Sequence, residues 1–433
     1  MATVSISDPA TCAGPSGPFL HVYVTIVDVQ VNTSATASAT DSGWQHIIPT
    51  LSSFKQIDLL GQANNQCFLA TLGDAKQLQA GTYQQVRVIL ADNSASISNN
   101  QCSAAGTANC VVLSADNKVY PLQLSSEAKT GIKIPSGQLA SGGFTIGAGQ
   151  TKDLNIDFDT CASIVQTGNG QFRLKPVLHA GEVTATGTSI NGTVIDKVSG
   201  KVIPGNVLVA LEQKDSTGVD RIVMSTLTNA DGTFTFCPLP TGMYDVVVVG
   251  ITSTGTVYAP AIVTGVSNGE TTGKIALSAP LLAGTSTATL TGKITSQNAG
   301  NSGTVTDVSL SALETISATT YTIPLVPNAQ QNAATATVTT AAGSSCPNNT
   351  DCASYSLLLP AAGAYIGAYS TSAATLMQSS PYATYVVDGI AFVPSSGGTL
   401  NCTPSEMKSQ AYALTAGGAT ISVTSALAFA QCQ

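Results

Sequence analysis

One short phrase, Gly-x-Tyr followed by a β-rich run, occurs three times in this chain. The copies are Gly81–Tyr83 before residues 84–90, Gly242–Tyr244 before 245–249, and Gly363–Tyr365 before 366–369. Glycine supplies the positive φ that a tight turn into a strand demands, and the tyrosine that follows can pack under the turn while its hydroxyl bonds nearby backbone. Three copies predict three β-sandwiches in series.

Length and composition suit this architecture and exclude several classes of function. A chain of 433 residues, 43% of them hydrophobic, can form about three domains that each have a core. Only 9% of the residues are charged, against about 25% in typical soluble domains. The net charge of −8 and the scattered Lys and Arg argue against a nucleic-acid partner. No apolar run approaches the roughly 18 residues of a membrane span.

The cysteines indicate an oxidising compartment. They are ten in number, and no two have the C-x-x-C spacing of redox or zinc sites, so disulfides are the favoured use and buried free thiols the alternative. We expect the chain to be exported, with a secretion signal originally preceding Met1. The ten are Cys12, Cys67, Cys102, Cys110, Cys161, Cys237, Cys346, Cys352, Cys402 and Cys432.

Spacing suggests some of the pairs. Cys102 with Cys110 and Cys346 with Cys352 would each pin a loop, and Cys402 is expected to pair with Cys432. Cys237 stands alone in its predicted domain. We therefore expect it to bond a cysteine of the first domain, Cys161 or Cys12, and so to fix the angle between two domains.

Strand-like alternation runs through the whole chain, and helical periodicity is almost absent. In Phe19–Val31, the residues Leu20, Val22, Val24 and Ile26 are expected on one face of a half-buried strand. Further predicted strands are Val86–Leu90, Thr151–Phe158 and Phe172–Leu178, separated by Gly, Asn and Ser clusters.

The middle of the chain carries three motifs in order. They are Gly192–Val194 (G-T-V), Asp231–Phe234 (D-G-T-F) and Leu239–Tyr244 (L-P-T-G-M-Y). Over Ser189–Ser278 the chain resembles the carboxypeptidase regulatory-like, transthyretin-type sandwich. Asp231-Gly232 predicts a hairpin-type turn, and Phe234 and Phe236 are expected to face one core.

The last third looks like a degraded copy of the middle part. Gly292-Lys-Ile-Thr follows Gly192-Thr-Val-Ile by 100 positions, and Tyr355–Tyr365 parallels Phe234–Tyr244. We expect a second transthyretin-like sandwich that lacks the Asp-Gly turn. The segment Ser296–Asn349 is interpreted as an insertion, and Ala419–Ala430 as a β-rich tail that could add strands or an interaction edge.

The first part has a likeness of its own. Asp157-Phe-Asp159, Ser163-Ile-Val, Thr167–Gly170 and Phe172–Pro176, with Ile57–Leu60 and Gly81–Tyr83 upstream, resemble the bacterial domain-of-unknown-function family 4382 over Val4–His179. The resemblance implies export, often as a lipoprotein, so a native lipid anchor is an open alternative. It implies no activity.

These observations predict an all-β chain of three tandem sandwiches. The domains are residues 1–182 (the unknown-function family), 183–280 (carboxypeptidase regulatory-like) and 281–433 (a second transthyretin-like sandwich with insertion and tail).

Two candidate sites arise from polar and aromatic residues. Asp153, Asp157 and Asp159 alternate with apolar residues, so their oxygens line one strand face where calcium could bind. A solvated or edge-protecting face is the favoured reading, and no cofactor is predicted. Trp44, the single tryptophan, is a candidate platform for a sugar, although a core or strand-end position is the more ordinary one.

The sequence contains few motifs that indicate catalysis. The three histidines lie in no H-E-x-x-H motif and beside no G-x-S-x-G elbow, and no phosphate-binding loop occurs. We therefore expect no enzyme. The predicted protein is exported, located at the cell surface or outside the cell, and has a structural or adhesion role. It could act as a filament subunit that associates with copies of itself. The alternative is a carbohydrate-binding surface protein. The sequence names neither the ligand nor the partner.

Overall fold

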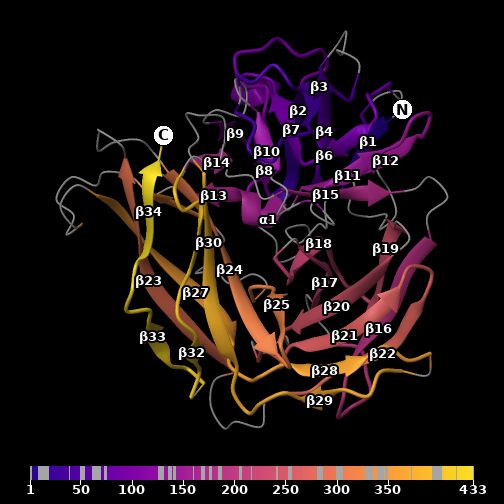
Figure 1. Cartoon of the computed structure of the whole chain (residues 1–433), viewed down its shortest axis with the longest axis vertical. Coiled ribbons are helices and arrows are strands. Elements are labelled where there is room, and N and C mark those ends of the chain that lie inside the picture. Colours follow the sequence, from indigo (N-terminus) through magenta and orange to yellow (C-terminus); the bar gives the residue numbers. More distant parts are fainter. Residues whose placement is uncertain are drawn as a thin grey trace. The chain divides into compact units, whose positions relative to one another are not determined.

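In a computed structural model the chain folds almost entirely into β-strands (Figure 1), which confirms the predicted all-β class. Among the described residues the helices are a 3-10 turn, η2 (Ser103–Ala105), and α1 (Thr160–Ser163). The described residues are 2–432 without 8–18, 39, 49–53, 61–69, 73–75, 125–130, 135–138, 140–142, 159, 167–170, 175–177, 184–187, 204–206, 216, 240–241, 252–255, 280–285, 299–305, 327–334, 339–345, 347–349, 372, 393–401 and 416.

The chain divides into two compact units. The first spans Met1–Thr186, and the second spans Gly187–Phe392 with Asn401–Gln433. The two domains expected at 183–280 and 281–433 thus fall almost wholly within one unit.

The first unit holds fifteen of the strands that the structure describes. They are β1 (Ala2–Ser7), β2 (Phe19–Asn32), β3 (Gln45–His46), β4 (Lys55–Asp58), β5 (Ala70–Thr71), β6 (Gly81–Tyr83), β7 (Gln85–Leu90), β8 (Cys110–Leu113), β9 (Val119–Gln123), β10 (Ile132–Ile134), β11 (Phe144–Ile146), β12 (Lys152–Phe158), β13 (Ile164–Gln166), β14 (Phe172–Leu174) and β15 (Leu178–Val183).

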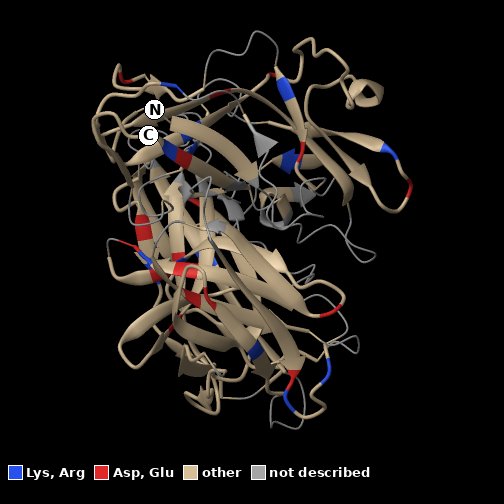
Figure 2. Cartoon of the chain, turned by 90° about the vertical axis from the view of Figure 1, so that its right-hand side faces the viewer, with Lys and Arg blue, Asp and Glu red and all other residues tan. Residues whose placement is uncertain are grey.

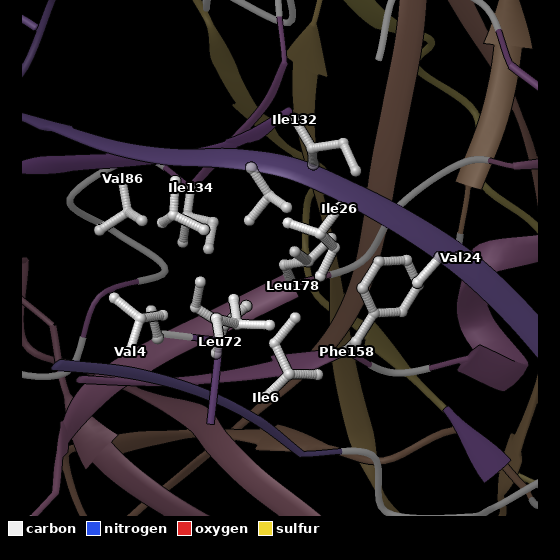
Figure 3. Close-up of a cluster of buried hydrophobic side chains, with 14 of the residues drawn as sticks. Val4, Ile6, Val24, Ile26, Leu72, Val86, Ile132, Ile134, Phe158 and Leu178 are labelled. Carbon is white, nitrogen blue, oxygen red and sulfur yellow. The ribbon is translucent and has the colours of Figure 1, made fainter. Parts of the chain in front are cut away.

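Two sheets of this unit enclose its core. One has the order β15-β12-β1-β5, and the larger has the order β10-β7-β2-β8-β9-β14-β13 with β3 and β4 paired to β2. Figure 3 shows Val86, Ile132 and Ile134 from the larger sheet facing Val4 and Ile6 from the smaller one. The alternating apolar residues of the strands therefore build a sandwich, because burying one face of each sheet removes both from water.

The long strand β2 departs from the expected alternation at its start. Leu20 was expected inside with Val22, Val24 and Ile26, but 44% of its surface is exposed while those three are fully buried. The register of β2 against β8 shifts between Phe19 and His21. A bulge places two residues opposite one, so it turns Leu20 outward and Phe19 inward.

The glycines of the Gly-x-Tyr phrases do not have the positive φ that was expected. Gly81 opens β6 in extended conformation. A Cβ on Gly363 would collide with the backbone oxygen of Ser380, so this glycine is needed for a close approach. The tyrosine of the first copy does act as expected, because Tyr83 is buried and its hydroxyl donates to the Gln79 carbonyl at 2.8 Å.

The second unit holds the remaining described strands. They are β16 (Thr188–Asp196), β17 (Val207–Lys214), β18 (Val219–Leu227), β19 (Thr233–Leu239), β20 (Met243–Gly250), β21 (Ala261–Ser267), β22 (Thr271–Leu277), β23 (Thr287–Asn298), β24 (Thr306–Ile316), β25 (Thr319–Ile323), β26 (Thr335–Val338), β27 (Asp351–Pro360), β28 (Tyr365–Ala368), β29 (Met377–Gln378), β30 (Thr384–Phe392), β31 (Glu406–Lys408), β32 (Tyr412–Ala413), β33 (Thr420–Ser422) and β34 (Leu427–Cys432).

This unit contains the same strand topology twice. In the first set, which we call the middle module (β16–β22), β16 lies between antiparallel β19 and parallel β22, and β17 lies between antiparallel β18 and β20. In the second set, the C-terminal module (β23–β34), β23 lies between antiparallel β27 and parallel β33 and β34, and β24 pairs antiparallel with β25 and β30.

The shared topology corrects two readings of the last third. The segment interpreted as an insertion, Ser296–Asn349, supplies β24 and β25, which are strands of the module itself. The tail supplies β33 and β34, which occupy the place of β22. One piece without a counterpart in the middle module is β28 with β29, which we call the crossing hairpin (Tyr365–Gln378), so Tyr365 does not correspond to Tyr244. The topological counterpart of Tyr244 is Tyr385, near the start of β30 and fully buried.

Each module has a glycine covered by an aromatic ring on the central strand of its smaller sheet. Gly192 pairs with Phe234, and Gly292 pairs with Tyr355. A Cβ on Gly192 would lie 2.7 Å from Cζ of Phe234 and 2.0 Å from Oγ1 of Thr272, and a Cβ on Gly292 would lie 2.4 Å from Cζ of Tyr355. The rings occupy the space of the missing side chains, which explains why the two glycines stand in equivalent places.

Gly192→Ala and Gly292→Ala should therefore each destabilise the second unit by about 1–3 kcal/mol, because overpacking forces a buried ring off its rotamer. Thermal unfolding followed by calorimetry measures this. Exposed Ala428→Ser in β34 is the control and should change little. An unchanged melting temperature for both glycine variants would contradict the role given to the rings.

The two modules share one continuous sheet. Its order is β29-β28-β21-β20-β17-β18-β25-β24-β30-β31. Parallel pairing of β18 with β25 joins the modules at one edge of the middle module, and the crossing hairpin covers the other edge by pairing β28 with β21. Main-chain hydrogen bonds thus run through both modules, and neither edge of the middle module's larger sheet is left open by the described strands.

Candidate functional site

Trp44, the candidate sugar platform, lies in a polar cluster of the first unit. Its indole nitrogen donates to the Ser38 carbonyl at 2.8 Å, and the Arg87 guanidinium stands 4.1 Å from the ring centroid. Lys133, the neighbour of Arg87 across β7 and β10, is 5.5 Å from the same centroid. The ring is half-buried and engaged by a cation, which leaves less of it for stacking against a sugar.

The cations beside Trp44 are held by polar groups on the same sheet. Arg87 donates from Nε to the Gln30 side chain at 2.7 Å, and the Gln30 amide donates to Asp28 at 2.6 Å. Lys133 donates to the Ala37 carbonyl at 2.9 Å, and burial with the nearby charge of Arg87 lowers its pKa to about 8. The cluster ties the segment around Trp44 to the sheet, which is a structural task.

The aspartates predicted as calcium candidates lie on β12 or just beyond it. Asp153 accepts a hydrogen bond from the Thr3 hydroxyl, and Asp157 is opposite Ser7 on β1 and His179 on β15. Asp159 lies outside the described residues. Within the part of the chain that the structure describes, no group of three His, Cys, Asp or Glu side chains is placed to hold a metal.

Three disulfides are described. They join Cys102 to Cys110, Cys346 to Cys352 and Cys402 to Cys432. The first closes the turn before β8, the second closes the start of β27, and the third holds the end of β34. Cys237 is also in a disulfide. The side chains of Cys12, Cys67 and Cys161 lie outside the description, so the pairing of Cys237 with Cys161 or Cys12 stays a prediction.

Charged side chains are sparse (Figure 2), but several gather along the shared sheet of the second unit. Arg221 of β18 is 12% exposed and contacts three carboxylates. It reaches Asp215 at 3.0 Å, Asp388 of β30 at 2.5 Å and Glu406 of β31 at 3.2 Å. Arg221 is therefore an ionic link between the two modules. Burial raises the pKa of Asp388 to about 6, although the Arg221 charge opposes that rise.

A second group consists of carboxylic acids beside β17. Glu212 is fully buried and stands directly opposite Asp245 of β20. One of its oxygens accepts from the Thr322 N–H at 3.3 Å. Burial, with the nearby charge of Asp220, holds the pKa of Glu212 well above its ordinary value. Burial likewise raises the pKa of Asp245 and of Asp220.

A third group consists of one buried acid, Glu314 of β24. It is 2% exposed and lies between Tyr321 of β25 and Tyr385 of β30 in the register of the sheet. Burial raises its pKa to about 8, and a hydrogen bond from the Ala364 N–H partly offsets this. Such buried acids do not reach a dissolved substrate, so their perturbed protonation is a property of the fold and not a sign of catalysis.

Sequence reasoning missed Arg221, Glu212 and Glu314 as residues of interest. The sequence did contain a signal. Only 9% of the residues are charged, yet each of these three charged residues lies within a β-rich segment, as in Ala210-Leu211-Glu212 and Ala312-Leu313-Glu314. Charges in such positions are expected to be paired or neutralised. The partners could not be named, since Asp388 lies 167 positions beyond Arg221.

Comparisons with protein families agree with the two resemblances found in the sequence. Residues 1–176 match the family described as domain of unknown function DUF4382, and residues 189–278 match the carboxypeptidase regulatory-like domain. Both assignments are thereby confirmed. Neither description names a catalytic activity.

No curated protein matches the chain. Solved structures with a partial likeness include the Bacillus anthracis TIE protein, at 11% identity and TM-score 0.18, which covers 97% of this chain and 49% of that one. The chain thus spans about half the length of that protein. Others are the minor pilin GBS52 of Streptococcus agalactiae and the shaft pilin spaA of Lactobacillus rhamnosus GG.

GBS52 is 14% identical with a TM-score of 0.19 and covers 56% of this chain and 95% of its own. The shaft pilin is 9% identical with a TM-score of 0.18 and covers 65% and 98%. At such TM-scores and identities, these likenesses carry no weight for function. Among the described residues, none of the helices is both long and apolar enough to span a bilayer.

Proposed function

We propose that this chain is an exported, non-enzymatic structural or adhesion protein of a cell surface or the extracellular space. The observation that carries the proposal is the sheet that continues through the middle and C-terminal modules. Domains within one chain usually meet through modest interfaces and move relative to each other. Here backbone pairing and the buried Arg221 link join the two modules, which suits a part that must hold its shape under load.

The cysteines support the location in this proposal. The described disulfides, together with the bonded Cys237, require an oxidising compartment to form and persist. The low charge and the hydroxyl-rich composition suit a surface that meets many neighbours without strong electrostatic preference. The proposal includes no cofactor, and it leaves a lipid anchor open.

Electron microscopy of the purified protein over a range of concentrations tests the self-associating form of this proposal. Concentration-dependent polymers are expected if the chain is a filament subunit, and size-exclusion chromatography should show the same growth. Single particles at every concentration would reject the filament form. Turnover on a panel of hydrolase substrates would reject the non-enzymatic assignment.

The second candidate is a carbohydrate-binding surface protein, suggested by the carboxypeptidase regulatory-like match, with Trp44 as the residue to test even though Arg87 already contacts its ring. Trp44→Ala should abolish binding on a glycan array if the ring is the platform. Trp44→Phe is the matched control, because it keeps a stacking face while losing the bond to Ser38. No binding by the unchanged protein would remove this candidate.

A further inference from the structure

The first and the last strand of the C-terminal module are parallel neighbours. β23 pairs with β33 over three residues and with β34 over five. The chain enters the module at the start of β23, Thr287, and reaches the end of β34 at Cys432. In a parallel pair these two positions lie at opposite ends of the ladder. The register shows this directly, because Thr289 pairs with Thr420 and Asn298 pairs with Cys432.

The direction in which such a ladder is pulled decides how it breaks. Tension applied at opposite ends of a parallel pair acts along the strands, so it loads all the hydrogen bonds together, in shear. Tension applied at the same end loads the outermost bond, and the ladder then opens one bond at a time. The bonds of a parallel pair are evenly spaced, so they share a lengthwise load. End-to-end tension on the C-terminal module therefore meets the resistance of the whole ladder.

Buried side chains add to this resistance. Four side chains of the ladder are at most 2% exposed, namely Leu290 and Ile294 of β23 and Leu427 and Phe429 of β34. For β34 to slide past β23, Leu427 and Phe429 must leave the core together, which exposes their apolar surface to water. On its other side β23 is held by antiparallel β27 over ten residues. Sliding is thus opposed by packing as well as by hydrogen bonds.

The end of β34 is also tied to the larger sheet of the module. Cys432 is bonded to Cys402, and the Thr403 N–H donates to the Ala430 carbonyl at 2.6 Å. A few residues further on, β31 pairs with β30 over three residues. Tension that arrives at Cys432 is therefore divided between β34 and β31. The chain between the two cysteines, a sequence separation of 30, cannot lengthen while the disulfide is closed.

We propose that the C-terminal module is a tension-bearing element, and that the ladder of β23 with β33 and β34 is the part that resists tension along the chain. A pull on the chain before Thr287 and after Cys432 loads this ladder lengthwise, whatever its source. The inference rests on the structural role proposed above and gives that role a mechanism.

Single-molecule pulling of the full chain with optical tweezers tests this role. One handle is fused to Met1 and one to Gln433, and a short peptide tag is inserted between Gly417 and Gly418, in the turn before β33. Pulling from Gln433 loads the ladder in shear, whereas pulling from the tag loads it at the end near Thr289. At equal force the module should survive at least about tenfold longer when it is pulled from Gln433, because forced unfolding is governed by the unfolding rate.

The same protein carries all the attachments, so both directions are compared in one fold. The length gained on unfolding assigns the event to this module. Cys402→Ser combined with Cys432→Ser should increase that gain by about 100 Å, because the sequence separation of 30 between the cysteines becomes free chain. Equal lifetimes in the two directions would overturn the proposal.

If the tagged protein does not fold, end-to-end pulling of the untagged chain decides the matter. One abrupt event with the length gain of the module supports the tension-bearing role, and release of β34 in small steps rejects it. Such a rejection would leave the proposed location and the absence of catalysis standing, because the disulfides and the hydrolase panel test those separately.

Discussion

Replacing Arg221 with methionine is expected to lower the free energy of unfolding of the second unit by about 3–5 kcal/mol. The side chain is 12% exposed, and its removal leaves the 1%-exposed carboxylate of Asp388 without its partner. The volume is nearly kept, so the loss reports charge and not a cavity. Differential scanning calorimetry should show a markedly lower melting temperature for Arg221→Met.

Two further variants sharpen this result. Lys408→Met removes an ion pair with Glu406 from a side chain that is 38% exposed, and it should cost about 0–1 kcal/mol. The double variant Arg221→Met with Asp388→Leu should regain part of the loss, because the more buried carboxylate is removed, while Asp215 loses its cation and keeps hydrogen bonds from Thr217 and Val219. Equal effects of Arg221→Met and Lys408→Met would show that Arg221 does not link the modules.

Glu314→Gln is expected to make the second unit more stable at alkaline pH and to leave it little changed near pH 4. The pKa of Glu314 is about 8 in the folded chain and about 4.3 when unfolded. Between these values the folded state binds a proton that the unfolded state has released. Stability therefore falls as pH rises through this window, by up to about 1.4 kcal/mol per pH unit, and is level above it.

Glutamine does not titrate, so the variant lacks this decline and should exceed the unchanged protein by about 3–5 kcal/mol at pH 9. Urea denaturation at pH 4, 6 and 9, followed by far-UV circular dichroism, measures the difference. Glu270→Gln, at a half-buried glutamate of the same unit, is the matched control for the substitution itself. A pH-independent difference between Glu314→Gln and the unchanged protein would contradict the assignment.

Local patterns allowed much of the fold to be predicted. Alternation in Phe19–Val31 and the motifs around Asp231 and Gly242 identified strands and turns, because side-chain direction in a strand depends on the immediate neighbours in sequence. The equivalence of Gly192 with Gly292 was visible for the same reason. Where a bulge intervenes, as at Leu20, the local pattern is wrong by one residue.

The sequence by itself determined the all-β class, the kinship of residues 1–176 and 189–278, and the chemistry of oxidised cysteines. These follow from composition and from contacts between residues close in the chain. Tertiary structure alone decided that Arg221 meets Asp388, that Glu314 anchors Ala364, and that the crossing hairpin completes the sheet of another module. Each of these contacts depends on which distant strands pair. The free energy that favours this pairing comes from contacts over the whole sheet, so no short segment of the sequence reveals it.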